Sequence, residues 1–499
     1  MNSIKQIKNG AFISYIAIIV NLVATLLYTP WMVSKIGTSN YGLYTLAISL
    51  ISIFLMDFGI GAVVTRFVAK YKVENDIRNI NNLLGLVFKL FIIIDIFIFL
   101  ILAVIFFSLK YIYSGLDVAE LEQFKSLYLI IAGFSVISFP FTILSGIFNA
   151  YEYFVQLKLC DMFQKVVTIV LIVVALLRGY GVIALVAVNA LVGISTILIK
   201  LIILKKKTTI TVNFKCRSHT LLREILNFSV WITVIGIAQR LTYNIAPSIL
   251  GAVSSSNEIA IYSPSAAIAG YFYTIAVAVD GLFLPTIFRK IAQKREGDIM
   301  SLMIRVGKYQ LFVLGMIYVG LVCIGKEFMI LWMGRKFTNS YYCILILALP
   351  TLIEYPQQIA RTTIIAKNKV KQQSVGLIVT SILNLFMGSL LSYYFGAIGV
   401  SLGICFTAFL NLIYMNYIYV KELKFDMLSY YKACYGKIMI PIIGTWYLTT
   451  MFLHEFQMKG WMGLIVNGIV IVAIFSVLSY GFLLDRGEKK KIVSIIRRS

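Results

Sequence analysis

The chain has 499 residues, of which 60% are hydrophobic and only 13% are charged, and its formal net charge is +24. This balance excludes an ordinary soluble protein, which needs a larger share of polar residues to cover its surface. The positive charge alone could suggest a nucleic-acid partner, but the basic residues gather in short segments between long apolar runs, which favours membrane topology instead.

Apolar runs of roughly 20 residues, long enough to cross about 30 Å of hydrocarbon, recur along the whole sequence. They predict an all-α, polytopic membrane protein with about fourteen transmembrane helices. The loops between the runs are too short for a sizeable soluble domain. The first run follows two lysines, as a signal peptide would, but it is too long and lacks a small-residue cleavage pattern, so it is interpreted as a helix. The predicted spans are 11–33, 43–69, 83–108, 126–150, 159–177, 182–204, 226–252, 259–286, 304–325, 341–365, 375–395, 397–420, 435–457 and 460–484.

The distribution of basic residues predicts the orientation. With the N-terminus inside, the inner segments and adjoining helix ends hold 35 Lys and Arg, whereas the outer segments hold 8. By the positive-inside rule, both termini are expected in the cytoplasm.

Landmarks of the first half recur in the second half at an almost constant offset. Ser39 and Ser256 are separated by 217 positions, and Pro140 and Pro356 by 216. An ordered series of this kind indicates duplication of a six-helix unit. We therefore predict an N-terminal six-helix bundle (1–204), a basic cytoplasmic linker (205–225), a pseudo-symmetric C-terminal six-helix bundle (226–420), and two additional helices with a basic tail (421–499).

Charged residues inside the first-half spans have both structural and functional interpretations. In the second span, Asp57 could bond to a neighbouring helix backbone, and Arg66 could extend to the cytoplasmic headgroups. Lys89 in the third span could extend in the same way or take part in function. Near the start of the fifth span, Asp161 and Lys165 have the i,i+4 spacing of a structural salt bridge.

The seventh predicted span is the most polar at its centre. Arg240 and Asn244 lie there with other polar residues, a few positions before Pro247. A centred arginine costs about 2.5 to 3.5 kcal/mol on insertion scales. Two explanations remain open, which are a buried ion pair and a site facing an internal cavity.

Two later spans also carry charge. Asp280 in the eighth span suits a helix-stabilising partner as well as an ion site. In the tenth span, Glu354 and Arg361 are seven positions apart, hence nearly on one helical stripe. Pro350 and Pro356 predict a kink there, and a bent helix with exposed polar backbone is tolerated where it borders a cavity.

The sequence contains no recognisable enzyme motif. It has no GxxxxGK[ST] phosphate loop, no HExxH, and no plausible serine, histidine and acid combination. The six cysteines and two histidines lack metal-site spacing, so neither a metal nor a cofactor is expected. Embedded arginine and lysine can hold an anionic substrate, and an embedded carboxylate can exchange a proton or sodium ion. We therefore expect transport driven by ion or substrate gradients.

Several short motifs together resemble a known family. The chain is similar to bacterial polysaccharide-unit flippases of the Wzx type, which transport O-antigen and related units. This family lies within the multidrug, oligosaccharidyl-lipid and polysaccharide exporter superfamily. The resemblance covers essentially the whole chain and rests on the order of weak motifs, which are Tyr41-Gly42-Leu43-Tyr44, Asp57-Phe58-Gly59-Ile60-Gly61, Arg66, Ile259-Ala260-Ile261-Tyr262, Leu284-Pro285 and Leu331-Trp332-Met333-Gly334.

The resemblance implies alternating access in a bacterial inner membrane. The implied substrate is an undecaprenyl-pyrophosphate-linked oligosaccharide, moved from the cytoplasmic to the outer leaflet for surface polysaccharide biosynthesis. Membrane lipids are implied partners, the polysaccharide polymerase machinery is a candidate partner, and no nucleic acid is expected. The resemblance implies a cationic cavity, and the candidates for contact with the substrate are Arg240, Lys89, Arg66, Arg361 and Asn244. Carboxylates suggest ion coupling, and the candidates for that role are Asp57, Asp280 and Glu354.

Two alternatives remain. A cation-coupled multidrug exporter of the same superfamily would suit the carboxylates but not Arg240 or the two additional helices. A membrane-embedded glycosyltransferase or polymerase would need larger extramembrane loops with catalytic carboxylates. The sequence leaves open the sugar unit, the choice between proton and sodium, the oligomeric state, and which embedded charges line one cavity.

Overall fold

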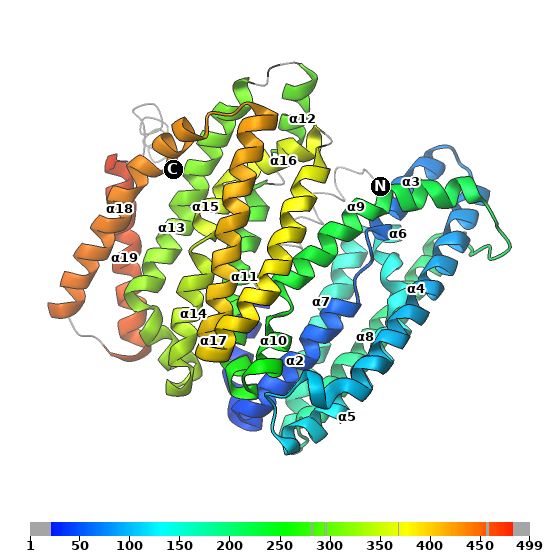
Figure 1. Ribbon diagram of the computed structural model, residues 1–499, viewed down its shortest axis with the longest axis horizontal. Helices are drawn as coiled ribbons and strands as arrows, with labels where there is room; N and C mark the ends of the chain where they lie inside the picture. Colours follow the sequence, from blue (N-terminus) through cyan, green and yellow to red (C-terminus); the bar gives the residue numbers. More distant parts are fainter. Residues whose placement is uncertain are drawn as a thin grey trace. The chain divides into compact units, whose positions relative to one another are not determined.

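The computed structural model consists of α-helices, short 3-10 helices and turns, and its described residues contain no β-strand (Figure 1). The structure describes residues 21–280, 283–293, 295, 297–367, 369–455 and 459–482. The chain forms two compact units. The first unit comprises Met1–Ala260 and Asn384–Gly396, and the second comprises Ile261–Leu383 and Ala397–Ser499. The two six-helix halves expected from the sequence repeat stay a prediction. The compact units are defined by contacts between residues, whereas a repeat is defined by the similarity of two segments.

The first unit begins with a helical stretch at residues 21–36. The helices that follow it are α2 (Thr38–Phe54), α3 (Ile60–Val73), α4 (Ile77–Ile112), α5 (Val118–Ser138), η1 (Phe139–Ile143), α6 (Leu144–Ala150), α7 (Phe154–Leu177), α8 (Val182–Lys207), α9 (His219–Tyr243) and α10 (Ala246–Val253).

The second unit contains most of α11 (Ser256–Asp280), which starts in the first unit and crosses over after Ala260. Its other helices are α12 (Leu284–Ala292), α13 (Gly297–Met333), η2 (Arg335–Phe337), α14 (Thr338–Ala348), α15 (Thr351–Glu354), η3 (Tyr355–Gln357), α16 (Gln358–Ala366), α17 (Val370–Leu423), α18 (Met427–Glu455) and α19 (Gly460–Phe482).

The predicted all-α, polytopic class is confirmed. Within the described residues, 11 helical segments are long and apolar enough to cross a membrane. One of them, α17, covers two predicted spans, and the predicted span 43–69 is divided between α2 and α3. Much of the first predicted span and the whole basic tail after Phe482 lie outside the described residues.

The boundary predicted between spans 375–395 and 397–420 coincides with a break in α17. Gly396 has φ +54°, a left-handed conformation that interrupts the helical geometry. A side chain at this position would also collide with the carboxylate of Glu258 in the first turn of α11. Glycine therefore satisfies both the backbone and the packing at this turn.

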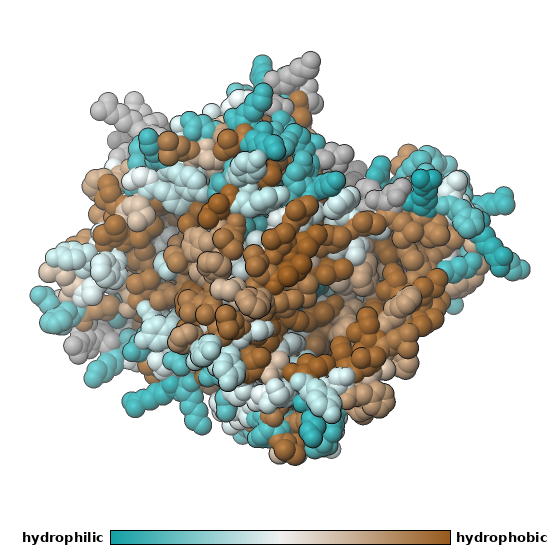
Figure 2. All heavy atoms as spheres, in the orientation of Figure 1, coloured by the Kyte–Doolittle hydropathy of each residue, from teal (hydrophilic) through white to brown (hydrophobic). Residues whose placement is uncertain are grey.

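The surface of each unit is rich in hydrophobic side chains, as expected for contact with lipid. Figure 2 shows hydrophobic residues over the middle of the visible face of each unit and hydrophilic residues towards its ends. On α4, for example, Phe107 is 82% exposed and Phe97 is 61% exposed. In water such a surface would be an aggregation risk, whereas in a bilayer it is solvated by acyl chains.

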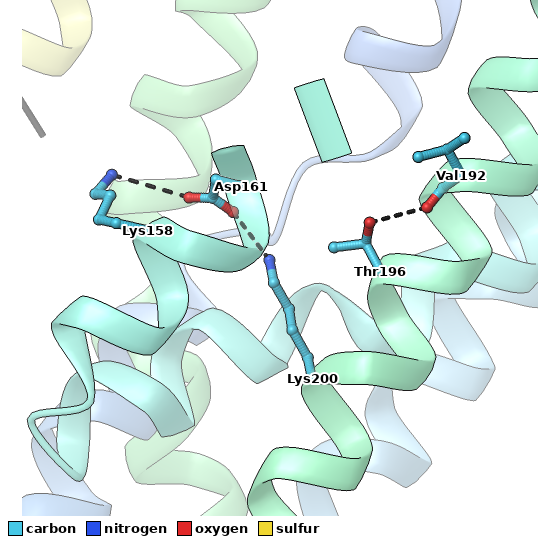
Figure 3. A network of polar contacts seen from close by, with 5 residues as sticks. All are labelled: Lys158, Asp161, Val192, Thr196 and Lys200. Atoms are coloured by element: carbon cyan, nitrogen blue, oxygen red, sulfur yellow. Dashed lines mark hydrogen bonds and ion pairs between the residues drawn. The ribbon is translucent and has the colours of Figure 1, made fainter. Parts of the chain in front are cut away.

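The predicted salt bridge between Asp161 and Lys165 is wrong. Asp161 on α7 instead pairs with Lys200 on α8 at 3.1 Å and lies 3.9 Å from Lys158. Figure 3 shows both lysines pointing at the carboxylate from opposite sides. The i,i+4 spacing missed this pairing because α8 packs directly against α7 and provides a nearer cation.

Candidate functional site

A bent helix in the second unit carries two of the predicted site residues. It consists of α14, α15, η3 and α16, and its irregular part begins at Pro350 and includes Pro356. Proline has no backbone N–H, so each ring removes one helical hydrogen bond and favours a bend. Glu354 ends α15 on one side of η3, and Arg361 lies in α16 on the other side.

Glu354 and Arg361 form an ion pair across the bend. Arg361 Nη1 lies 3.3 Å from Glu354 Oε1, and the two side chains are only 20% and 19% exposed. This contact agrees with the stripe predicted from their seven-residue spacing. Two desolvated charges are stable only as a pair, so anything that removes one partner leaves the other at a considerable cost.

The ion pair borders a small cavity whose lining contains both polar and apolar side chains. The free volume is about 10 Å³, room for about one water molecule and too little for a sugar. Besides the ion pair, the bent helix contributes Gln357 to the lining. The two halves of α17 contribute the rest of it, which is Gln373, Leu377, Asn411, Leu412, Met415 and Tyr419.

Four polar residues of this lining were not singled out from the sequence, namely Gln357, Gln373, Asn411 and Tyr419. Gln373 is 4% exposed and Tyr419 is 3% exposed. Asn411 Oδ1 is buried and accepts no hydrogen bond from a described residue. An amide within an apolar run was the available signal, because buried amides are normally satisfied by specific partners.

Arg240 and Asn244 lie in the first unit, where α9 ends. Asn244 follows the last turn, and its N–H donates to the carbonyl of Arg240 at 3.0 Å. Arg240 is half-buried and forms no ion pair with another described residue. The buried ion pair that was one explanation for Arg240 therefore lacks an acidic partner in the part of the chain that the structure describes.

The break after α9 is stabilised by a residue that sequence analysis did not identify. Asn384, which is fully buried, donates its amide to the carbonyls of Leu241 and Thr242 at 3.2 and 3.3 Å. The last carbonyls of a helix have no partner within it, so Asn384 supplies the missing donors. Asn384 thus contacts the end of α9 directly after Arg240 and ahead of Pro247.

Asp57 is exposed and lies in the turn between α2 and α3 rather than inside a continuous helix. Its Oδ1 accepts a hydrogen bond from Gly59 N–H at 3.1 Å, and its carbonyl accepts one from Ile60 N–H. The carboxylate therefore bonds to the backbone two residues on, as in an Asx-turn, and stabilises the turn before α3, which is a local structural task. Arg66, also exposed, lies further along α3 with its guanidinium 5.9 Å from the centre of the Phe67 ring.

Lys89 binds the basic linker. Its Nζ donates to the carbonyl of Cys216 at 2.9 Å. Asn81, two turns earlier on α4, holds the same linker through Thr211 and Asn213. Among the predicted site residues that remain, Asp280 ends α11 and its side chain lies outside the described residues.

Of the eight predicted site residues, only Glu354 and Arg361 pair through their side chains in the described structure, whereas Arg240 and Asn244 are joined through their backbone alone. The ion pair lies in the second unit, whereas Arg240, Asn244, Lys89, Arg66 and Asp57 lie in the first. The arrangement around the pair has a clear chemical capability. A substrate anion can compete with Glu354 for the arginine fork, and protonation of Glu354 would release Arg361 in the same way.

Comparison with known proteins places the chain in one family and one fold. Residues 7–285 match the family described as "Polysaccharide biosynthesis protein". No curated protein matches the sequence. The structural neighbours below are all 14% identical or less, so they establish the fold only.

Three solved structures illustrate the fold. "Lipid II flippase MurJ, inward closed conformation" has a TM-score of 0.70 and 14% identity, covering 94% of this chain and 97% of that one. An inward-facing multidrug resistance MATE family transporter has a TM-score of 0.65 and 13% identity, covering 80% and 95%. A MOP superfamily transporter from Pyrococcus furiosus, described as having a binding pocket of reversed polarity, has a TM-score of 0.59 and 13% identity, covering 85% of this chain and 98% of that one.

Proposed function

This chain belongs to the polysaccharide biosynthesis protein family, and we propose that it is a flippase for undecaprenyl-pyrophosphate-linked oligosaccharides. It has the fold of transporters in the multidrug, oligosaccharidyl-lipid and polysaccharide exporter superfamily. The proposed direction is from the cytoplasmic to the outer leaflet of the bacterial inner membrane, with both termini in the cytoplasm. The sugars cross through the protein while the lipid chain remains in the bilayer.

The observation that carries this proposal is the Glu354–Arg361 ion pair, which lies in a bent helix long and apolar enough to span a membrane and borders a small internal cavity. A passive bundle has no need of charges there, since each embedded charge costs free energy. A transporter can use the arginine, because a guanidinium binds phosphate oxygens with two parallel hydrogen bonds. The cavity must widen before a sugar can enter, which alternating access would provide.

Arg240 is proposed as a second contact for the pyrophosphate or an acidic sugar. It is half-buried at the end of a broken helix and forms no ion pair with a described residue. Asn244, Lys89 and Arg66 remain weaker candidates for substrate, and Asp57 and Asp280 for ion coupling. Glu354 is the preferred coupling group, because its protonation would release Arg361 for substrate.

The test is translocation in proteoliposomes that contain a labelled undecaprenyl-pyrophosphate oligosaccharide, with imposed proton or sodium gradients. We expect protein-dependent movement that Arg240→Ala and Arg361→Ala abolish while the protein still inserts. Near-normal movement by a well-folded Arg240→Ala variant would remove that residue from the site. No movement of the lipid-linked sugar under any gradient would refute the flippase assignment.

A multidrug exporter is the second candidate, favoured by the fold similarity to MATE transporters and by the embedded carboxylates. The same vesicles distinguish the two functions when they carry a cationic dye. Movement of the dye alone would identify a drug exporter, and movement of the lipid-linked sugar alone would identify the flippase.

A further inference from the structure

The bend that carries Glu354 leaves a backbone oxygen without its helical donor. In a regular helix the carbonyl of Leu352 would accept from the N–H of residue 356, but that residue is Pro356. The hydroxyl of Tyr435 on α18 lies 3.0 Å from Leu352 O and 3.4 Å from Ile353 O. A tyrosine from another helix therefore supplies the donor that the proline lacks.

A second tyrosine of α18 bonds to the same bend at Pro356. Tyr430, which is fully buried, donates to the carbonyl of Pro356 at 2.7 Å. Gly307 on α13 makes room for this contact. A Cβ at position 307 would lie 2.7 Å from the Tyr430 hydroxyl and 3.0 Å from Pro356 O.

A third tyrosine connects α18 to the cavity lining. The hydroxyl of Tyr431 accepts hydrogen bonds from Gln357 Nε2 at 2.7 Å and Asn416 Nδ2 at 2.9 Å. Gln357 faces the same cavity as the ion pair. The rings of Tyr430, Tyr431 and Tyr435 also contact one another, with centroids 5.4 to 6.4 Å apart. Such packing limits the movement of each hydroxyl.

We propose that Tyr430, Tyr431 and Tyr435 are positioning residues that fix the bend and thereby hold Glu354 and Arg361 at their pairing distance. In the repeat predicted from the sequence, α18 is one of the two helices without a counterpart in the first half. Through Tyr431 and Gln357 this additional helix would act on the lining of the cavity. The consequence for transport rests on the proposed function, whereas the structural role can be measured without any substrate.

The test follows access to the cavity through a cysteine introduced by Asn411→Cys. Its labelling rate with a maleimide is measured in purified protein, and the rate of the parent with its six natural cysteines is subtracted. We expect Tyr435→Phe to accelerate labelling about tenfold, equivalent to ~1.4 kcal/mol, because a backbone oxygen loses its donor. The matched control is Tyr447→Phe, which removes a hydroxyl from the same helix at a site 58% exposed. Its labelling rate should equal that of the parent.

The second arm adds Pro356→Ala, which returns an N–H to Leu352 O. If the hydroxyl of Tyr435 replaces that missing donor, Pro356→Ala should bring the labelling of Tyr435→Phe back towards the parent rate. A general loss of packing would not be rescued in this way. The proposal is overturned if Tyr435→Phe behaves like Tyr447→Phe, or if Pro356→Ala adds to its effect. If the labelling rates of all variants are as expected but the protein does not move lipid-linked sugar, the flippase function is refuted and the positioning role of the tyrosines stands.

Discussion

Ser39 and Ser256 are 217 positions apart in the chain, yet their hydroxyl oxygens lie 3.1 Å apart. Both hydroxyls also donate to Glu120 Oε1, and Glu120 Oε2 accepts from Asp117 N–H within the capping box of α5. The predicted repeat would make the two serines equivalent, and in the structure both contact one carboxylate. Gly42 permits the approach, since a Cβ there would collide with the carbonyl of Ser256.

The contact of Ser39 and Ser256 with Glu120, called here the serine junction, should hold the predicted outer end of the first unit closed. The probe is a cysteine introduced by Leu46→Cys, at a position that is fully buried and close to Gly251 of α10. We expect Glu120→Gln to make this cysteine accessible. Labelling by an impermeant maleimide should become about tenfold faster, because hydrogen bonds to a carboxylate are among the stronger ones. The matched control is Glu122→Gln, which alters a carboxylate of α5 paired with Lys125. Equal labelling of the two glutamine variants would contradict this role.

A second control separates the serine junction from the stability of α5. Asp117→Ala removes the helix cap but leaves the serine contacts of Glu120, so its labelling should stay at the parent rate. The double variant Ser39→Ala/Ser256→Ala should reproduce the effect of Glu120→Gln. If Asp117→Ala accelerated labelling as much as Glu120→Gln, fraying of α5 would be the better explanation.

How much the sequence could predict depends on whether a contact follows from spacing. The seven-residue interval between Glu354 and Arg361 predicted a shared stripe, which their ion pair confirms. The constant offset predicted only that Ser39 and Ser256 are equivalent, which stays a prediction, and it did not predict that they touch. Lys89 was different, because its acceptor is the Cys216 carbonyl, a backbone group 127 positions away with no side-chain signature. The tyrosines of α18 were equally hidden, since nothing local shows which helix a hydroxyl will reach.

The Glu354–Arg361 pair predicts an asymmetric pattern of stability. Arg361→Gln should destabilise the protein by about 1 to 3 kcal/mol, because Glu354 keeps its charge but loses its partner. The double variant Glu354→Gln/Arg361→Gln should be less destabilised, since neither charge remains. Thermal unfolding in detergent measures both. A double variant that is less stable than Arg361→Gln would show that Glu354 has another, stronger partner.

Asn384 predicts a position-specific effect on the broken helix. Asn384→Asp keeps the size of the side chain but removes the donors to Leu241 and Thr242, and it places a carboxylate beside two carbonyls. We expect a loss of about 1 to 3 kcal/mol in the free energy of unfolding. Unfolding of Asn189→Asp provides the comparison, because that residue also donates in the first unit, to Tyr44 and Leu185, but away from the break. Equal losses would mean that the break has no special dependence on Asn384.

Lys89 has two candidate roles, anchoring the basic linker and binding the substrate, and its substitution distinguishes them. Lys89→Met should release the linker from α4, because the hydrogen bond to Cys216 O is lost. Trypsin should then cut the detergent-solubilised protein several-fold faster at Lys215 and Arg217, which are already exposed. Lys72→Met, which alters an exposed lysine of the same unit over the Tyr151 ring, should leave this cleavage unchanged.

Transport by the same variants completes the distinction. If Lys89 only anchors the linker, Lys89→Met should still move lipid-linked sugar, with a reduced maximal rate and an unchanged half-saturating substrate concentration, because no substrate contact is removed. A raised half-saturating concentration with normal trypsin resistance would instead place Lys89 in contact with the substrate. In that case the bond to Cys216 would be the resting arrangement of a residue that exchanges a backbone carbonyl for a phosphate oxygen.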